Sequence, residues 1–196
     1  MDLPSALQTF RSFTDQVKIF SDDDWHRLAS QFALYEAGRK VTITQAGEAE
    51  RYLYFVVGGV QRVFYFDDQN REATLVFTYA PSFGGVIDSM VLGGRSKYSY
   101  ETLTPSLFLR APYRQIEMLR KEMPALDEMM QMGVMSALSG ILERLAEIQC
   151  FTSEEKFRSL MGRSPHLLNL VPHKYIANYL GIDPTNFSKL VNRIRF

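Results

Sequence analysis

The spacing of apolar residues in this 196-residue chain changes close to Pro112 from that of β-strands to that of α-helices, and this change limits the folds that the chain can adopt. From Phe32 to Leu109 the apolar residues form short runs rich in Val, Ile, Tyr, Phe and Thr, separated by turn residues, as in β-strands. Gly58-Gly59 separates two of these runs and has the form of a two-residue hairpin turn. Many short strands at regular spacing predict a β-sandwich or barrel, here of the jelly-roll type.

After Pro112 the apolar residues recur every three or four positions, which is the period of an α-helix. Pro124 opens the longest helical segment, which runs to about Cys150 with an apolar stripe that includes Met130, Val134, Ala137, Ile141, Leu145 and Ile148. A stripe this long is unusual in so small a chain, and a second such helix would cover it. We therefore interpret it as the contact between two copies of the chain. The alternative is that it packs only on the chain's own β-domain.

The C-terminal segment predicts two helices joined by a tight corner. Gly181 can adopt the left-handed conformation that ends the first helix, and Asp183-Pro184 has the form of an N-cap followed by the first helical position. The outward positions of the second helix hold residues whose side chains can form hydrogen bonds, and none of these residues is acidic. We predict a helix-turn-helix in which the residues that contact base edges or nearby groups are Thr185, Asn186, Ser188 and Lys189, and those that contact phosphates are Arg193 and Lys174. A helical hairpin with no nucleic-acid role is the alternative.

Charge is distributed unevenly along the chain, although the net charge is zero. Residues 156–196 contain seven Lys or Arg and a single acid, Asp183, so this segment carries +6 and the rest of the chain carries −6. A basic segment on an acidic body points to a polyanionic partner. Together with the predicted helix-turn-helix, it indicates double-stranded DNA.

These patterns predict an α+β protein with three parts. Residues 1–122 would form a β jelly roll with N-terminal helices, residues 123–150 a dimerisation helix, and residues 151–196 an all-α helix-turn-helix domain. Ser153 is expected to cap the first helix of this last part.

A glycine-rich segment, Phe83–Ser96, interrupts the predicted strands. Glycines before a short helical turn can expose backbone N–H groups, which together form a site for an anion. Arg95 could bind a phosphate through two parallel N–H bonds, and Ser96 could add a hydroxyl donor. The candidate ligand-binding residues are therefore Gly84, Gly85, Arg95 and Ser96; the alternative is that the glycines only turn a corner and Arg95 lies in solvent.

Several classes of protein are excluded or disfavoured by what the sequence contains. Cys150 is the single cysteine, so an intrachain disulfide and a cysteine-ligated metal site within one chain are excluded. Residues 33–109 contain no histidine, which argues against a jelly-roll metalloenzyme, and no hydrolase, zinc-protease or Walker motif occurs. We expect no catalytic residues, no bound metal and no enzymatic activity. No run approaches the roughly 20 apolar residues of a membrane helix, and the first four residues carry no basic charge, so we expect a cytoplasmic protein without a signal peptide.

The order of these features resembles the Crp/Fnr family of cyclic-nucleotide-type transcription regulators over roughly residues 15–194. The resemblance is carried by Gln45-Ala46-Gly47-Glu48, by the Tyr52–Val56 run with Gly58-Gly59-Val60, and by the segment Pro172–Ile182. It implies a cyclic-nucleotide-binding-like domain, dimerisation along the long helix and binding to promoter DNA, with RNA polymerase as a further candidate partner. It implies no certain cofactor; a cyclic nucleotide or another small anion is the candidate effector.

The sequence also departs from this family. Members that bind cyclic AMP have Gly-Glu where this chain has Gly84-Gly85. The resemblance therefore implies that the phosphate contact of Arg95-Ser96 is retained, whereas the contact of the glutamate with the sugar is lost. Cys150 alone cannot hold an iron–sulfur cluster, and all three histidines lie outside the β-domain, which gives no support for haem. The family usually adds a β-wing after the recognition helix, and we expect fewer backbone contacts to DNA here. The alternative function is a ligand-binding or interaction protein that no longer binds DNA.

Overall fold

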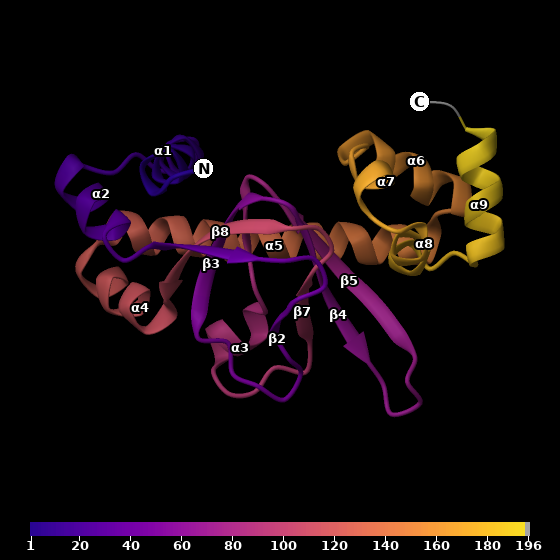
Figure 1. The fold of residues 1–196 in the computed structure, drawn as a ribbon, viewed down its shortest axis with the longest axis horizontal. Coiled ribbons are helices and arrows are strands. Elements are labelled where there is room, and N and C mark those ends of the chain that lie inside the picture. The colour runs from indigo at the N-terminus through magenta and orange to yellow at the C-terminus, as the bar shows by residue number, and fades with distance from the viewer. Residues whose placement is uncertain (195–196) are drawn as a thin grey trace.

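The computed structural model describes residues 1–194 and confirms the α+β architecture (Figure 1). The strands are β1 (Ala33–Ala37), β2 (Thr42–Thr44), β3 (Tyr52–Gly58), β4 (Val60–Phe66), β5 (Glu72–Tyr79), β6 (Ser82–Gly84), β7 (Ser99–Thr102) and β8 (Ser106–Pro112). They form two four-stranded antiparallel sheets, with the orders β1-β8-β3-β6 and β2-β7-β4-β5. In the second sheet β5 lies at an edge, which bears on the contacts described below.

Helices flank the sheets at both ends. Those on the β-domain side are α1 (Leu3–Thr14), α2 (Asp22–Ala29), α3 (Ile87–Leu92) and α4 (Tyr113–Glu122). The long helix α5 (Pro124–Cys150) runs behind the sheets and leads to the C-terminal helices α6 (Ser153–Arg163), α7 (Leu167–Leu170), α8 (His173–Leu180) and α9 (Pro184–Arg193) (Figure 1). No helix within residues 1–194 is long and apolar enough to cross a membrane.

The apolar core is divided into three clusters. Phe10 and Phe55 lie at the centre of the first, which joins α1, α2, α4 and the start of α5 to one face of the first sheet. Tyr54, Tyr100 and Phe108 belong to the second, which fills the space between the two sheets. The third is the core of the C-terminal helices and extends to the β-domain, as described below. Because the first two clusters share β3 and β8, that pair of strands links the N-terminal helices to the interior of the sheets.

Local helix signals in the sequence are largely reproduced. Asp183 caps α9, and Gly181 takes the left-handed conformation at the end of α8. The prediction of Ser153 as the cap of α6 is wrong, because Thr152 holds that position. Its hydroxyl accepts from the Glu155 N–H, and the Glu155 carboxylate accepts from the Thr152 N–H, a reciprocal arrangement that Ser153, one residue later, could not make.

Candidate nucleic-acid interface and ligand cassette

Helices α8 and α9 form a helix-turn-helix whose corner is fixed by two residues. Gly181, with φ of 62°, reverses the chain after α8. The Asp183 carboxylate then accepts hydrogen bonds from the N–H groups of Thr185 at 2.9 Å and Asn186 at 3.2 Å, which satisfies donors at the start of α9. Phe187 is fully buried and meets Phe157 of α6 edge to face, with ring centroids 5.5 Å apart. The inner face of α9 is therefore held by packing, and its outer face is exposed.

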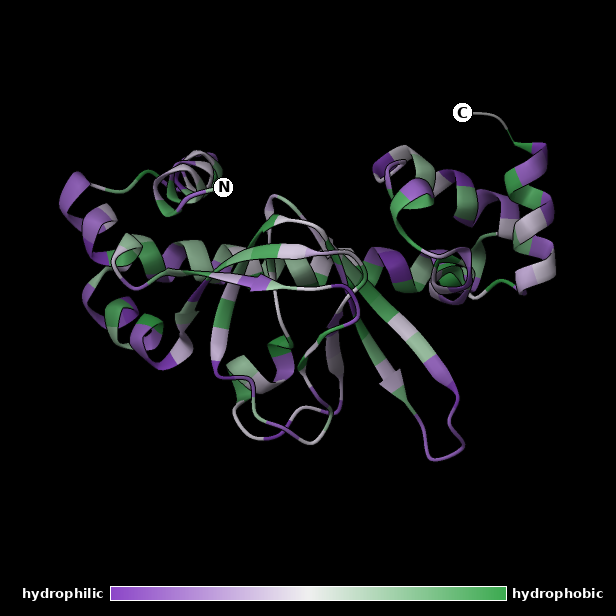
Figure 2. Cartoon of the chain, in the orientation of Figure 1, coloured by the Kyte–Doolittle hydropathy of each residue, from purple (hydrophilic) through white to green (hydrophobic). Residues whose placement is uncertain are grey.

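The structure places all six sequence-predicted nucleic-acid contacts on the surface, at Lys174 of α8 and at Thr185, Asn186, Ser188, Lys189 and Arg193 of α9. Hydrophobic and hydrophilic residues alternate along α9 in Figure 2, as expected for a helix with one buried face. Arg193 forms an ion pair with Glu154 of α6, and the Asn186 side chain donates to the Ser153 hydroxyl at 3.4 Å. These exposed contacts are weak, so they could be exchanged for contacts to phosphates and bases at small cost.

Helix α8 is attached to the free edge of β5 by a single side chain. Asn178 Oδ1 accepts from the Thr74 N–H at 2.5 Å, and Asn178 Nδ2 donates to the Glu72 carbonyl at 2.7 Å. The amide of Asn178 thus makes the two hydrogen bonds that a neighbouring strand would make to this edge. Phe77 of β5 and Tyr179 of α8 add a ring contact, with centroids 5.0 Å apart.

Arg62 of β4 lies beneath the same contact and is almost completely buried, with its side chain 2 % exposed. Its guanidinium forms ion pairs with Glu72 at 2.7 Å and Glu101 at 2.6 Å. One face of the guanidinium lies 3.8 Å from the ring centre of Tyr175 in α8, a cation–π contact in a desolvated site. Arg62 therefore connects both strands that flank β4 to the first helix of the helix-turn-helix.

A third connection joins α5 to the C-terminal helices. Glu147 is buried and accepts from Arg163 and from the Ser159 hydroxyl of α6, and the hydrogen bond from Arg163 holds the pKa of Glu147 below its usual value. Arg144 of α5 donates to the Tyr179 carbonyl of α8. Sequence reasoning missed all of these docking residues, because their partners lie far away in sequence and no local pattern marks them.

Five exposed apolar residues of α5 follow a coiled-coil repeat, whereas Met132, Met135 and Leu142 are exposed outside it. At alternating spacings of four and three, the chain exposes Val134, Leu138, Ile141, Leu145 and Ile148. Two predicted members of the stripe are less exposed than the rest. Met130 is half-buried and packs against the first core cluster, and Ala137 is half-buried on the same side of the helix as Val134 and Ile141. The first turns of α5 are covered by the chain's own core, so the unpaired stripe begins only near Val134.

The predicted glycine cassette is shaped by packing against the sheet interior. A side chain at Gly84 would collide with the Tyr100 hydroxyl, and Gly85 has φ of +112°, a conformation that favours glycine. Both glycines are buried. Close packing thus explains why residue 84 is glycine, and the backbone conformation explains why residue 85 is glycine.

The polar groups of the cassette have partners within the chain. The buried Ser96 hydroxyl donates to Asp88 at 2.9 Å, and the exposed Arg95 donates to the Gly47 carbonyl at 2.9 Å. Glu50 comes from the turn before β3, and its Oε2 lies 3.6 Å from where a Cβ of Gly85 would be. The chain thus places two carboxylates of its own, from Asp88 and Glu50, at the segment where an anion was predicted.

Glu50 itself is 8 % exposed and held by several donors. Its carboxylate accepts from the Thr44 hydroxyl at 2.5 Å and from the N–H groups of Arg51 and Tyr52 at 2.9 and 3.1 Å. Burial raises the pKa of this carboxyl, and the hydrogen bonds oppose the shift. Within residues 1–194 no group of three His, Cys, Asp or Glu side chains could hold a metal ion.

Comparisons with known proteins identify the fold. No protein-family model matches the sequence, and no curated protein matches it. Among solved structures, the chain is similar to FixK2 from Bradyrhizobium japonicum, with a TM-score of 0.74, 13 % identity and 83 % of each chain covered. It is similar to a putative Crp/Fnr-family regulator from Eubacterium rectale, with a TM-score of 0.71, 13 % identity and coverage of 88 % of this chain and 82 % of that one. It is also similar to the c-di-GMP-responsive regulator CLP from Xanthomonas campestris, with a TM-score of 0.66, 12 % identity and coverage of 88 % and 91 %.

These identities are low, so the likeness concerns the fold. The matched regions include most of each chain. The chain therefore has the fold of the Crp/Fnr transcription regulators, as the resemblance in its sequence predicted.

Proposed function

We propose that this protein is a dimeric transcription regulator of the Crp/Fnr type that binds double-stranded DNA. The observation that carries the proposal is the outer face of α9. It presents hydroxyl, amide and cationic groups without an acid, on a helix whose other face is buried in a helix-turn-helix. Amide and hydroxyl groups can read base edges in the major groove, and cations bind phosphates.

Dimerisation would follow from the apolar stripe of α5 that begins at Val134. A second copy of the chain is the partner that a 4-3 repeat of aliphatic residues fits, since each such helix offers the knobs and holes that the other needs. Two recognition helices related by two-fold symmetry would then meet half-sites one helical turn apart, about 34 Å.

In this proposal an effector signal reaches DNA through the contacts between β5 and α8. Asn178 and Arg62 attach the helix-turn-helix to the β4–β5 hairpin, so a displacement of this hairpin relative to α5 would move α8 with it. The distance between the two recognition helices of the dimer would change, and with it the fit to the two half-sites.

Replacing Lys189 with Ala tests the assignment of the recognition helix. We expect weaker binding to double-stranded DNA and a smaller slope of log affinity against log salt, because a cation that faces the DNA is lost. Fluorescence anisotropy at several salt concentrations measures both quantities. Lys97→Ala is the matched control, since Lys97 is exposed on the β-domain. An unchanged affinity and slope for Lys189→Ala would show that α9 does not face DNA.

A second prediction concerns cyclic nucleotides. Because Asp88 already accepts from the Ser96 hydroxyl and the Glu50 carboxylate lies beside Gly85, we expect millimolar cyclic AMP or cyclic GMP to leave the melting temperature unchanged. A site filled to 100 times its Kd would add about 2.7 kcal/mol to the free energy of unfolding, which a thermal melt detects easily. A rise in melting temperature with either nucleotide would show that the cassette can exchange its internal partners for a phosphate.

A further inference from the structure

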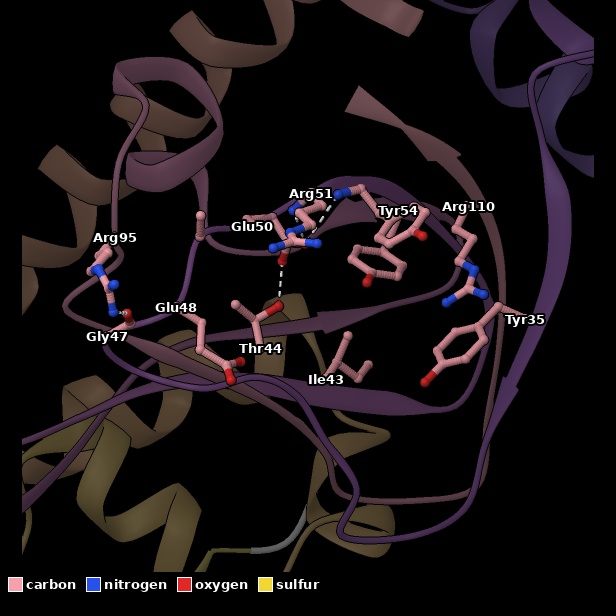
Figure 3. A pocket seen from close by; sticks show the side chains of 12 residues that line it. Tyr35, Ile43, Thr44, Gly47, Glu48, Glu50, Arg51, Tyr54, Arg95 and Arg110 are labelled. Atoms are coloured by element: carbon pink, nitrogen blue, oxygen red, sulfur yellow. Dashed lines mark hydrogen bonds between the residues drawn. The ribbon is translucent and has the colours of Figure 1, made fainter. Parts of the chain in front are cut away.

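A cleft of about 470 Å³ lies beside the cassette, between β1, β2, β3 and β8 and the turn at residues 45–51. It has the size of a site for a small molecule. Its lining includes Arg51, Arg95 and Arg110 together with Tyr35, Tyr52 and Tyr54. Figure 3 shows Arg110 beside Tyr35 at one end, Arg95 beside Gly47 at the other, and Arg51 between them.

The arginines of this cleft stand out by their lack of carboxylate partners. Residues 1–194 contain fourteen arginines, and nine of them form ion pairs. The five that do not, within this part of the chain, are Arg39, Arg51, Arg95, Arg110 and Arg114. Three of these five line the same cleft. This concentration of unpaired positive charge suits an anion.

Arg110 is also held in a fixed orientation. Its guanidinium lies 4.1 Å from the ring centre of Tyr35 and 4.7 Å from that of Tyr52. Contact with two aromatic rings limits its motion and leaves its N–H groups available, so less entropy is lost when it binds an anion.

The acids that line the cleft do not form ion pairs with these arginines. Glu50 is held by Thr44 and by backbone N–H groups, and Glu48 accepts from the Gln45 N–H at 3.2 Å. The three arginines therefore have no carboxylate partner within the described residues, although both acids lie in the same cleft.

We propose that this cleft binds a small polyanion with acidic groups at both ends, and that this ligand is the effector of the regulator. Arg110 would hold one end, Arg95 the other, and Arg51 would neutralise charge between them. Carboxylates and phosphates share the chemistry that arginines recognise. The effector role rests on the proposed function, whereas binding in the cleft does not.

The test uses isothermal titration of the intact protein with citrate and, separately, with pyrophosphate, at ionic strength matched by sodium chloride. We expect saturable binding of at least one probe, and the probe that binds more tightly distinguishes a carboxylate from a phosphate ligand. Arg51→Gln and Arg95→Gln should each weaken the Kd at least tenfold. Both residues are exposed, so both variants should fold. Arg114→Gln, which removes an unpaired arginine outside the cleft, should bind as the unaltered protein does.

Two results would overturn the proposal: no saturable binding of either probe, or binding that persists unchanged in Arg51→Gln and Arg95→Gln. An equal loss in Arg114→Gln would also contradict it, because general charge rather than the cleft would then attract the anion. DNA binding is measured separately on the same preparation without probe. If the protein binds DNA but neither probe, only the proposed anion site in the cleft is refuted. If it binds a probe but no DNA, only the proposed function is refuted.

Discussion

Replacing Ile141 and Leu145 together by Glu is expected to convert the proposed dimer into a monomer at micromolar concentration. Both side chains are about half exposed in one chain, at 54 % and 48 %, and both lie in the 4-3 repeat of α5. In a paired helix the two carboxylates would be buried against their symmetry mates without partners, which costs several kcal/mol. Light scattering after size-exclusion chromatography measures the change in mass directly.

The same double variant should bind operator DNA at least about 100-fold more weakly. In a monomer, binding of one recognition helix to a half-site no longer brings a second recognition helix to the other half-site at a high effective concentration. Leu92→Glu is the control, since Leu92 is 83 % exposed on α3, away from the repeat. It should stay dimeric and bind DNA normally. A double variant that remains dimeric would show that the two copies meet elsewhere, or that α5 packs on some other surface.

Replacing Arg62 by Met should cause the largest loss of stability of any single substitution considered. The change removes a buried cation and leaves Glu72 and Glu101 partly buried without their partner. Breaking a buried ion pair costs about 3–5 kcal/mol, which corresponds to a fall of roughly 10 °C in the melting temperature of a chain of this length. The cation–π contact with Tyr175 is lost as well, so α8 should also be held less firmly.

Arg71→Met is the matched control for this prediction. Arg71 lies at the tip of the same hairpin and forms an ion pair with Asp67, but its side chain is 76 % exposed. Exposed pairs contribute little, so the melting temperature should change by no more than about 2 °C. Equal effects of the two substitutions would contradict the account of Arg62 as the residue that ties the β-domain to the helix-turn-helix.

The parts of this fold that the sequence predicts are those with local signals. Gly181, Asp183 and Pro184 act through their own backbone conformation and through hydrogen bonds to residues two or three positions away, so the corner of the helix-turn-helix could be predicted. The short runs of Val, Ile, Tyr, Phe and Thr and the turn at Gly58-Gly59 placed the β-domain in the same way. The long helix was visible because its apolar residues repeat over many turns.

The parts that the sequence does not reveal depend on partners far apart in the chain. Asn178 looks like an ordinary polar residue of α8 until β5 is placed against it, 104 residues away. Glu50 gains its role at the cassette only because the turn before β3 folds next to Gly85. Sequence spacing also cannot tell that the chain's own core packs against Met130, at the start of the predicted stripe on α5.

The most direct test of the account is selection of binding sites from a library of random duplex DNA by the purified protein. We predict enrichment of a two-fold symmetric sequence whose half-sites are about 10 base pairs apart, centre to centre, because two α9 helices related by α5 would read it. Enrichment of a single unrepeated motif would contradict the dimer. No enrichment at all would contradict the proposed function and would favour a ligand-binding or interaction protein built on the same fold.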